Sequence, residues 1–106
     1  MDIQTIQPAL IKYLETIKKQ VTVSGAILYG SIVEGKATES SDVDLIILSD
    51  NFQNLDDFER GKLLYRASVG FPYDLHVYGL TPHEFNTASP LTSLGQIRYS
   101  HTLRIS

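Results

Sequence analysis

Two short apolar runs constrain the fold of this chain most. The first covers residues 26–29 and ends at Gly30, and the second covers residues 43–48; both are rich in branched side chains. Apolar runs this short, bounded by polar or turn residues, are typical of strands buried in a sheet, because helices are usually about ten residues or longer. The sequence therefore predicts two buried strands.

Amphipathic helices are predicted outside these two strands. Residues 3–19 and residues 52–69 place apolar side chains at helical spacing, with charged side chains on the opposite side. Proline is tolerated in the first turn of a helix but not beyond it. Because of Pro8, the first helix proper is expected to begin near Gln7.

Shorter elements are expected elsewhere. Residues 73–78 alternate enough to form a third strand, residues 102–105 form a terminal edge strand, and the polar segment 31–41 holds one short helix and a loop. Thr81-Pro82-His83-Glu84 is a capping box with proline at the first helical position, so a helix starts there. The predicted fold class is α/β (α+β), a small mixed β-sheet flanked by helices, in a single domain over residues 1–106.

The composition narrows the classes of function. Hydrophobic residues make up 42% of the chain and charged residues 20%, a balance that supports a packed core. No apolar run approaches the ~18–20 residues of a membrane-spanning helix, and the start does not resemble a signal peptide, so a soluble, cytoplasmic protein is expected. The absence of cysteine excludes disulfides, thiolate catalysis and cysteine-ligated zinc. A net charge of −3 argues against direct binding to a nucleic-acid duplex.

Two aspartates at the start of the second strand are the first candidate site residues. Asp42 and Asp44 are two positions apart, so their side chains project from the same face of the strand. Two carboxylates that share a small volume repel each other, and a divalent cation relieves that repulsion. Oxygen ligands without cysteine or clustered histidine favour magnesium or manganese over zinc.

Gly30-Ser31 is the complementary half of the site. These residues end the first strand and open the segment that is expected to begin with a short helix, whose free N–H groups would bind phosphate. Glycine permits close approach of the backbone to a phosphate oxygen, and the serine hydroxyl adds a hydrogen-bond donor. The two halves together predict a cradle for a nucleoside triphosphate and its metal. A common Gly-Ser turn and a solvated strand end remain the structural alternatives.

A phosphate-binding P-loop is a rival interpretation of the same glycines. Gly30 is followed by four residues and then by Gly35-Lys36, but Ala37 stands where a P-loop needs Ser or Thr. Without that hydroxyl the loop would lack its usual magnesium ligand, so the rival is disfavoured.

The motif residues resemble those of a known family. Gly30-Ser31, Gly35 and Ser41-Asp42-Val43-Asp44-Leu45 are similar to the signature of the DNA polymerase β-like nucleotidyltransferase superfamily, and the chain resembles its minimal nucleotidyltransferase branch. The resemblance implies a third carboxylate from a neighbouring strand, and Asp74 is similar in placement. His76 shares the strand face of Asp74 and could orient a metal-binding carboxylate.

One residue departs from the family pattern. Members commonly carry Arg just before the second glycine, where this chain has Glu34. A carboxylate facing the triphosphate would repel it, by ~1 kcal/mol in water at ~4 Å separation and by ~4 kcal/mol at an effective dielectric near 20. Lys36 is the nearest candidate to supply the missing positive charge; alternatively, Glu34 points to solvent.

The resemblance implies a function. A nucleoside monophosphate, AMP first among the candidates, would move from an NTP such as ATP to a hydroxyl, with two magnesium ions (manganese as the substitute) held by Asp42, Asp44 and Asp74 and the nucleotide contacted by Gly30, Ser31 and Lys36. The acceptor would lie on another chain: the family resemblance implies a helical HEPN toxin, for which this chain would be the antitoxin. The rival is an inactive module that neutralises its partner by contact alone. A third alternative is transfer to a small molecule such as an aminoglycoside; the lack of an acceptor domain disfavours it, although a homo-oligomer could supply one.

Overall fold

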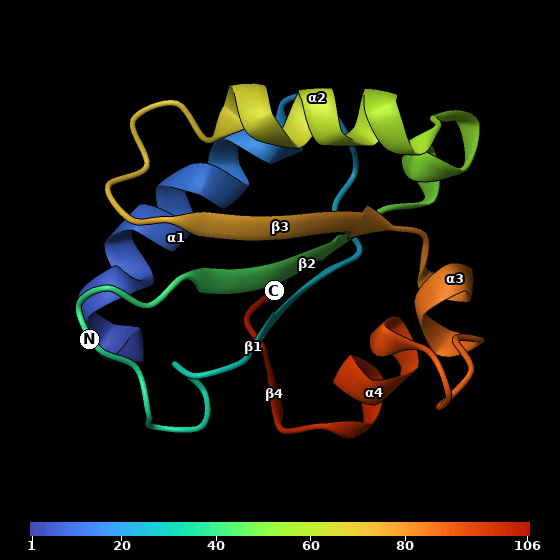
Figure 1. Cartoon of the computed structure of the whole chain (residues 1–106). Helices are drawn as coiled ribbons and strands as arrows, with labels where there is room; N and C mark the ends of the chain where they lie inside the picture. Colours follow the sequence, from blue (N-terminus) through green and yellow to red (C-terminus); the bar gives the residue numbers. More distant parts are fainter.

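The computed structural model describes residues 1–106, apart from the side chain of Tyr99. Five helices, one of them a 3-10 helix, and four strands follow one another along the chain (Figure 1). In order they are α1 (Ile3–Lys18), β1 (Gly25–Tyr29), β2 (Val43–Leu48), the 3-10 helix η1 (Asp50–Asn54), α2 (Asp57–Ala67), β3 (Leu75–Leu80), α3 (Pro82–Asn86), α4 (Ser93–Tyr99) and β4 (Thr102–Arg104).

The four strands form one mixed sheet in the order β3-β2-β1-β4. β1 pairs antiparallel with β2 and with β4, whereas β2 and β3 run parallel. The connection between the parallel strands contains η1 and α2, as a parallel crossover requires. The predicted fold class, a small mixed sheet with helices, is therefore confirmed.

The two faces of the sheet are covered unequally. Alternate residues of β2, Val43, Leu45 and Ile47, pack with the buried residues of α1 and α2 into the larger core cluster. On the other face Ile46 and Leu48 join a smaller cluster with the side chains of α3 and α4. β2 is buried on both faces of the sheet. For this reason residues 43–48 have no polar side chain except that of Asp44.

The first helix begins earlier than predicted. α1 starts at Ile3, and the carboxylate of Asp2 caps it by accepting hydrogen bonds from the backbone N–H of Thr5 at 2.9 Å and from the Thr5 hydroxyl at 2.8 Å. Pro8 lies inside the helix on its exposed side. The expected start near Gln7 was wrong because the cap and the burial of the apolar face outweigh the single hydrogen bond that proline removes.

Three further assignments differ from the predictions. The third strand covers Leu75–Leu80, not residues 73–78, since it pairs with β2 from Val43 to Leu48. Residues 31–35 form hydrogen-bonded turns, not the expected short helix. The predicted helix over residues 52–69 is divided into η1 and α2, because Asp56 starts a new helix with a capping box that it forms with Glu59. The capping box at Thr81 and the terminal strand, by contrast, are found where the sequence predicts them.

A buried arginine joins four of these elements. Arg60 of α2 is 7% exposed and donates hydrogen bonds to the carbonyl oxygens of Leu55, Gly79 and Phe52. Its guanidinium also forms an ion pair with Glu84 of α3, with 2.7 Å between Nη1 and Oε1. The pKa of the Glu84 carboxyl is lowered, since the hydrogen bonds from Arg60 and Thr81 outweigh the opposing effect of burial.

No helix in the described part of the chain is long and apolar enough to cross a membrane.

Candidate functional site

Asp44 occupies the open part of the sparsely covered sheet face. The register places it between Tyr29 of β1 and His76 of β3. α3 and α4 cover this face only around Ile46 and Leu48, one and two side chains further along β2. The start of β2 therefore presents a carboxylate that is 21% exposed, at the rim of an otherwise apolar strand.

Gly30 lies directly against this carboxylate. Its φ is +82°, and a Cβ atom at this position would come within 2.3 Å of Oδ2 of Asp44. Any side chain at position 30 would be both strained and in collision with Asp44. The glycine thus lets the chain turn away from β1 while its backbone lies directly against the carboxylate.

The turns after Gly30 replace the helix that the sequence predicts. The backbone N–H of Glu34 bonds to the carbonyl of Gly30 at 3.1 Å, and that of Lys36 bonds to the carbonyl of Ser31 at 2.9 Å. The expected helix N-terminus is therefore absent from this segment, and any phosphate contact would come from the turn and the Ser31 hydroxyl. The P-loop interpretation is also wrong, because a P-loop leads directly into a helix.

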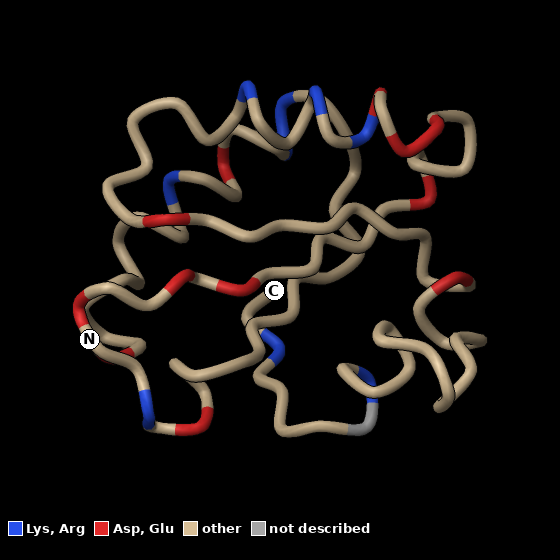
Figure 2. Tube along the Cα trace, viewed as in Figure 1, with Lys and Arg blue, Asp and Glu red and all other residues tan. Residues whose placement is uncertain are grey.

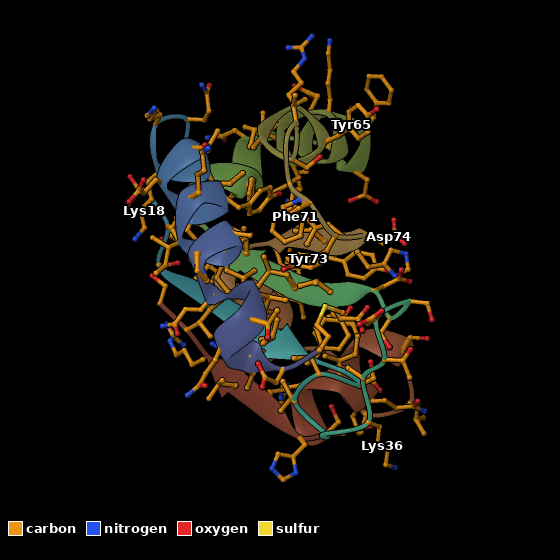
Figure 3. All side chains as sticks on the ribbon, turned by 90° about the vertical axis from the view of Figure 1, so that its left-hand side faces the viewer. Lys18, Lys36, Tyr65, Phe71, Tyr73 and Asp74 are labelled. Carbon is orange, nitrogen blue, oxygen red and sulfur yellow. The ribbon has the colours of Figure 1, made fainter. Side chains whose placement is uncertain are left out.

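Asp74 approaches the first two aspartates through the backbone. Its carbonyl oxygen accepts a hydrogen bond of 2.7 Å from the N–H of Val43, the residue between Asp42 and Asp44. Because Val43 and Leu75 are paired, continuing the parallel register by one residue brings Asp42 opposite Asp74. All three carboxylates belong to one end of two adjacent strands, and Figure 3 shows Asp74 at the outer edge of this end of the sheet.

The side chains are nevertheless not gathered into a ligand cluster. Within the part of the chain that the structure describes, no three His, Cys, Asp or Glu side chains form a group that could hold a metal ion. Asp42 and Asp74 are exposed, and only Asp44 is partly buried.

The electrostatics of the site centre on Asp44. Burial raises the pKa of its carboxyl, and the charge of Asp42 raises it further, whereas His76 acts in the opposite direction. Nδ1 of His76 lies 3.7 Å from Oδ1 of Asp44, although the His76 side chain is 66% exposed. Sequence reasoning paired His76 with the Asp74 face; its nearest carboxylate is that of Asp44.

Tyr29 is a site residue that sequence reasoning missed. Burial, followed by the charges of Asp44 and Tyr78, raises the pKa of its phenol to about 12. Strand alternation could have found it, because the residue before Gly30 must share a face with the residue opposite it on β2.

Glu34 and Lys36 both lie exposed on the loop that follows Gly30. In Figure 3 Lys36 extends from this loop on the same side of the molecule as Asp74 but at the lower end of the view. Among the described residues neither Glu34 nor Lys36 forms an ion pair. Both side chains are therefore free to reorient toward a ligand.

Comparison with known proteins assigns the chain to a family. A family model described as a nucleotidyltransferase domain matches residues 10–97, which include β1, β2, β3, the Gly30 turn and all three aspartates. The chain belongs to this nucleotidyltransferase family. No match was found among curated proteins.

Solved structures share the fold of this chain. A Sulfolobus solfataricus protein described as a nucleotidyltransferase superposes with a TM-score of 0.69 at 13% identity, covering 94% of this chain and 78% of its own. A toxin–antitoxin structure with AMP-PNP gives 0.63 at 20% identity, covering 92% and 70%. Another structure described as a nucleotidyltransferase gives 0.62 at 26% identity, covering 92% and 97%.

Proposed function

We propose that this chain transfers a nucleoside monophosphate, with AMP as the first candidate, from an NTP to a hydroxyl group of a partner protein in the cytoplasm. The observation that carries the proposal is the contact between Gly30 and Asp44. It combines an open backbone turn with a partly buried carboxylate at the edge of the sheet, next to Asp42 and Asp74. A triphosphate needs the first feature and its cations need the second.

The donor set fits magnesium, with manganese as a substitute. Asp42, Asp44 and Asp74 would hold the two ions through oxygen atoms alone, which is the chemistry that these hard cations prefer. Burial raises the pKa of Asp44, and a bound cation would favour its ionised form. When bound, the ions neutralise the triphosphate and lower the pKa of the attacking hydroxyl. Asp42 and Asp74 are exposed and can turn toward Asp44 to complete the set.

The residues of the chain would then position the reactants. Gly30 allows the triphosphate to approach the backbone, the Ser31 hydroxyl donates to a phosphate oxygen, and Lys36 supplies positive charge. The acceptor oxygen forms a bond to the α-phosphorus while the bond from that phosphorus to the bridging oxygen breaks, and pyrophosphate leaves. Asp74 helps to accept the hydroxyl proton. Alignment of these groups supplies much of the rate.

A helical HEPN-type toxin is the proposed acceptor, with this chain as its antitoxin. The toxin–antitoxin structure with AMP-PNP supports a protein partner and a nucleotide for this fold. The motif around Gly30 and Asp44, which resembles that of minimal nucleotidyltransferases, supports the same assignment.

A labelling experiment tests the proposal. The purified chain is incubated with the HEPN-type partner, magnesium and ATP carrying the label on either the α- or the γ-phosphate. Label should pass to the partner from the α position only, and D42N or D44N should abolish it. Asp50, an exposed residue beyond the opposite end of β2, provides the matched control D50N, which should label normally. Labelling that survives both D42N and D44N would refute the assigned site.

A second candidate function is neutralisation of the partner by contact alone. The exposed Glu34, at the position where members of the family commonly carry Arg, favours this candidate because its carboxylate would repel a triphosphate. Calorimetry separates the two functions. Binding of the partner with no heat from ATP and magnesium would support the contact function, whereas heat that D44N abolishes would support transfer.

A further inference from the structure

The outer face of α2 carries an unpartnered apolar stripe. Phe58 is 77% exposed, Tyr65 76% and Val69, just beyond the helix end, 83%. These residues and Gly61 recur at helical spacing, so they lie along one face. A cluster of exposed large side chains on one helix is a recurrent mark of an interface. In Figure 3 the ring of Tyr65 points away from the body of the molecule.

Gly61 forms a gap in the middle of this stripe. A Cβ atom there would meet nothing within 4 Å, so the position is open to solvent. A glycine on an exposed helix face allows another backbone or a large side chain to come close. The stripe therefore offers two large groups on either side of a hollow that could receive an aromatic ring.

Charges on the rim of the stripe differ between the two ends of α2. Asp57 and Glu59 lie in the first turn and Arg66 in the last turn. Figure 2 shows this change from acidic to basic along the helix. A helix that is acidic at its start and basic at its end complements an identical helix running in the opposite direction.

We propose that α2 packs antiparallel against α2 of a second copy of this chain, in a two-fold symmetric dimer. A single antiparallel register provides a contact for each of these groups. Phe58 faces Val69 of the second copy, and Tyr65 covers the gap at Gly61 of the second copy. Glu59 forms an ion pair with Arg66 of the second copy. A two-fold axis then repeats each contact, as an isologous interface requires. A second copy is the partner that matches both the spacing and the charges of the stripe at once.

Lys62 opposes this association. It lies near the expected two-fold axis, where it would face Lys62 of the second copy, so its ammonium group must extend to water while its aliphatic stem covers apolar surface. α2 has 11 residues and is therefore about 16 Å long. An interface of this length belongs to the small, reversible class, and the dimer is weak.

The association is independent of nucleotide transfer, because α2 packs on the opposite face of the sheet from Asp44. Sedimentation equilibrium of the full chain is expected to show the average mass rising toward twice that of one chain between about 10 μM and 1 mM. K62Q should strengthen the dimer by removing the repulsion at the axis.

Charge reversal gives the decisive test. E59K alone and R66E alone should each weaken association about tenfold, because each turns two attractive contacts into repulsive ones. An equimolar mixture of the two variants should recover association, since each copy then supplies the charge that the other needs. E15K, a matched reversal at an exposed position of α1, should leave association unchanged.

A variant that blocks the interface sterically separates a loss of association from a loss of folding. G61L introduces a good helix former, so it should keep the chain folded while filling the hollow that receives Tyr65. Folded G61L should be monomeric throughout the concentration range. A wild-type chain that stays monomeric to about 1 mM, a mixture of E59K and R66E that fails to recover association, or G61L that associates normally would overturn the proposal.

Discussion

The backbone of Gly30 and the carboxylate of Asp44 are in direct contact, with room for a hydrogen but not for a methyl group between them. A Cβ at position 30 would lie 2.3 Å from Oδ2 and 3.1 Å from Cγ of Asp44. β1 and β2 are antiparallel neighbours with Tyr29 paired to Asp44, so the turn that leaves β1 passes beside the aspartate. The contact couples the loop that begins at Gly30 to the start of β2, so a shift of the Gly30 backbone also shifts the Asp44 carboxylate.

Substitution of Gly30 should therefore affect both stability and activity. G30A adds left-handed strain of about 1–2 kcal/mol to the collision with Asp44, and a displacement of about 1 Å at the carboxylate is expected to reduce transfer about a hundredfold. Gly70 provides the matched control because its φ is +88° but a Cβ there would meet nothing within 4 Å, and it lies outside the candidate site. Urea unfolding and label transfer should show G70A losing stability alone. Equal loss of transfer in both variants would contradict the coupling.

Removal of the Arg60 guanidinium should destabilise the fold strongly. R60M keeps most of the apolar stem but leaves the carbonyls of Leu55, Phe52 and Gly79 without this donor, and each buried acceptor left unsatisfied costs about 1–3 kcal/mol. E84Q should cost less than about 1 kcal/mol, because an amide still accepts a hydrogen bond and an exposed ion pair contributes little; the Glu84 side chain is 42% exposed. Urea unfolding of both variants measures the difference. Similar losses would show that the ion pair, and not the set of carbonyl contacts, is the main contribution.

The sequence predicts the parts of the fold that depend on local pattern. The runs at residues 26–29 and 43–48 are strands because their side chains are apolar over a short length, and the box at Thr81 starts a helix because its polar groups satisfy the helix end. The sequence also contains a signal for the true start of α1. Asp2, three residues before Thr5, is a typical N-cap residue, whereas Pro8 alone predicts a later start.

Features that depend on contacts between distant parts of the chain could not be predicted from local sequence pattern. Arg60 is buried because carbonyls from η1, from the segment before α2 and from β3 converge on it, and no local spacing encodes that convergence. The strand order likewise depends on packing, and so does the proximity of Asp74 to Asp42. The resemblance implied that proximity. The backbone hydrogen bond from Val43 to Asp74 brings the two chain segments together, while the gathering of the three carboxylates remains a prediction.

Gly61 offers a stabilising substitution. It lies in the interior of α2, where a Cβ would meet nothing within 4 Å, so G61A should increase the free energy of unfolding by about 1 kcal/mol through helix propensity alone. Gly70 is the contrasting control: it is equally uncrowded, but its φ of +88° makes an alanine strained, so G70A should be less stable. Thermal unfolding at low protein concentration, where association does not contribute, should show shifts of opposite sign. A loss of stability in G61A would contradict the open environment of Gly61.

Asp44 should reduce the stability of the fold when it is ionised. Burial, and then the charge of Asp42, raises the pKa of this carboxyl in the folded chain. The folded state therefore keeps a proton in a pH range where the unfolded chain has released it. The stability that the neutral carboxyl contributes is complete below the unfolded pKa, near 4, and is lost as the pH rises through the folded pKa. D44N cannot ionise and should avoid this loss.

The unfolding free energies of wild type and D44N should accordingly be similar near pH 3, and D44N should become the more stable protein as the pH rises above about 4. His76 acts to lower the pKa of Asp44, so H76A should extend the loss of stability to higher pH, and the double variant with D44N should follow D44N alone. Urea titrations across this range measure each difference. A difference between wild type and D44N that does not change with pH would contradict the cost of ionisation. A D44N protein that is more stable at neutral pH yet inactive in transfer would fit a carboxylate kept for chemistry at the expense of stability, as is common for functional residues.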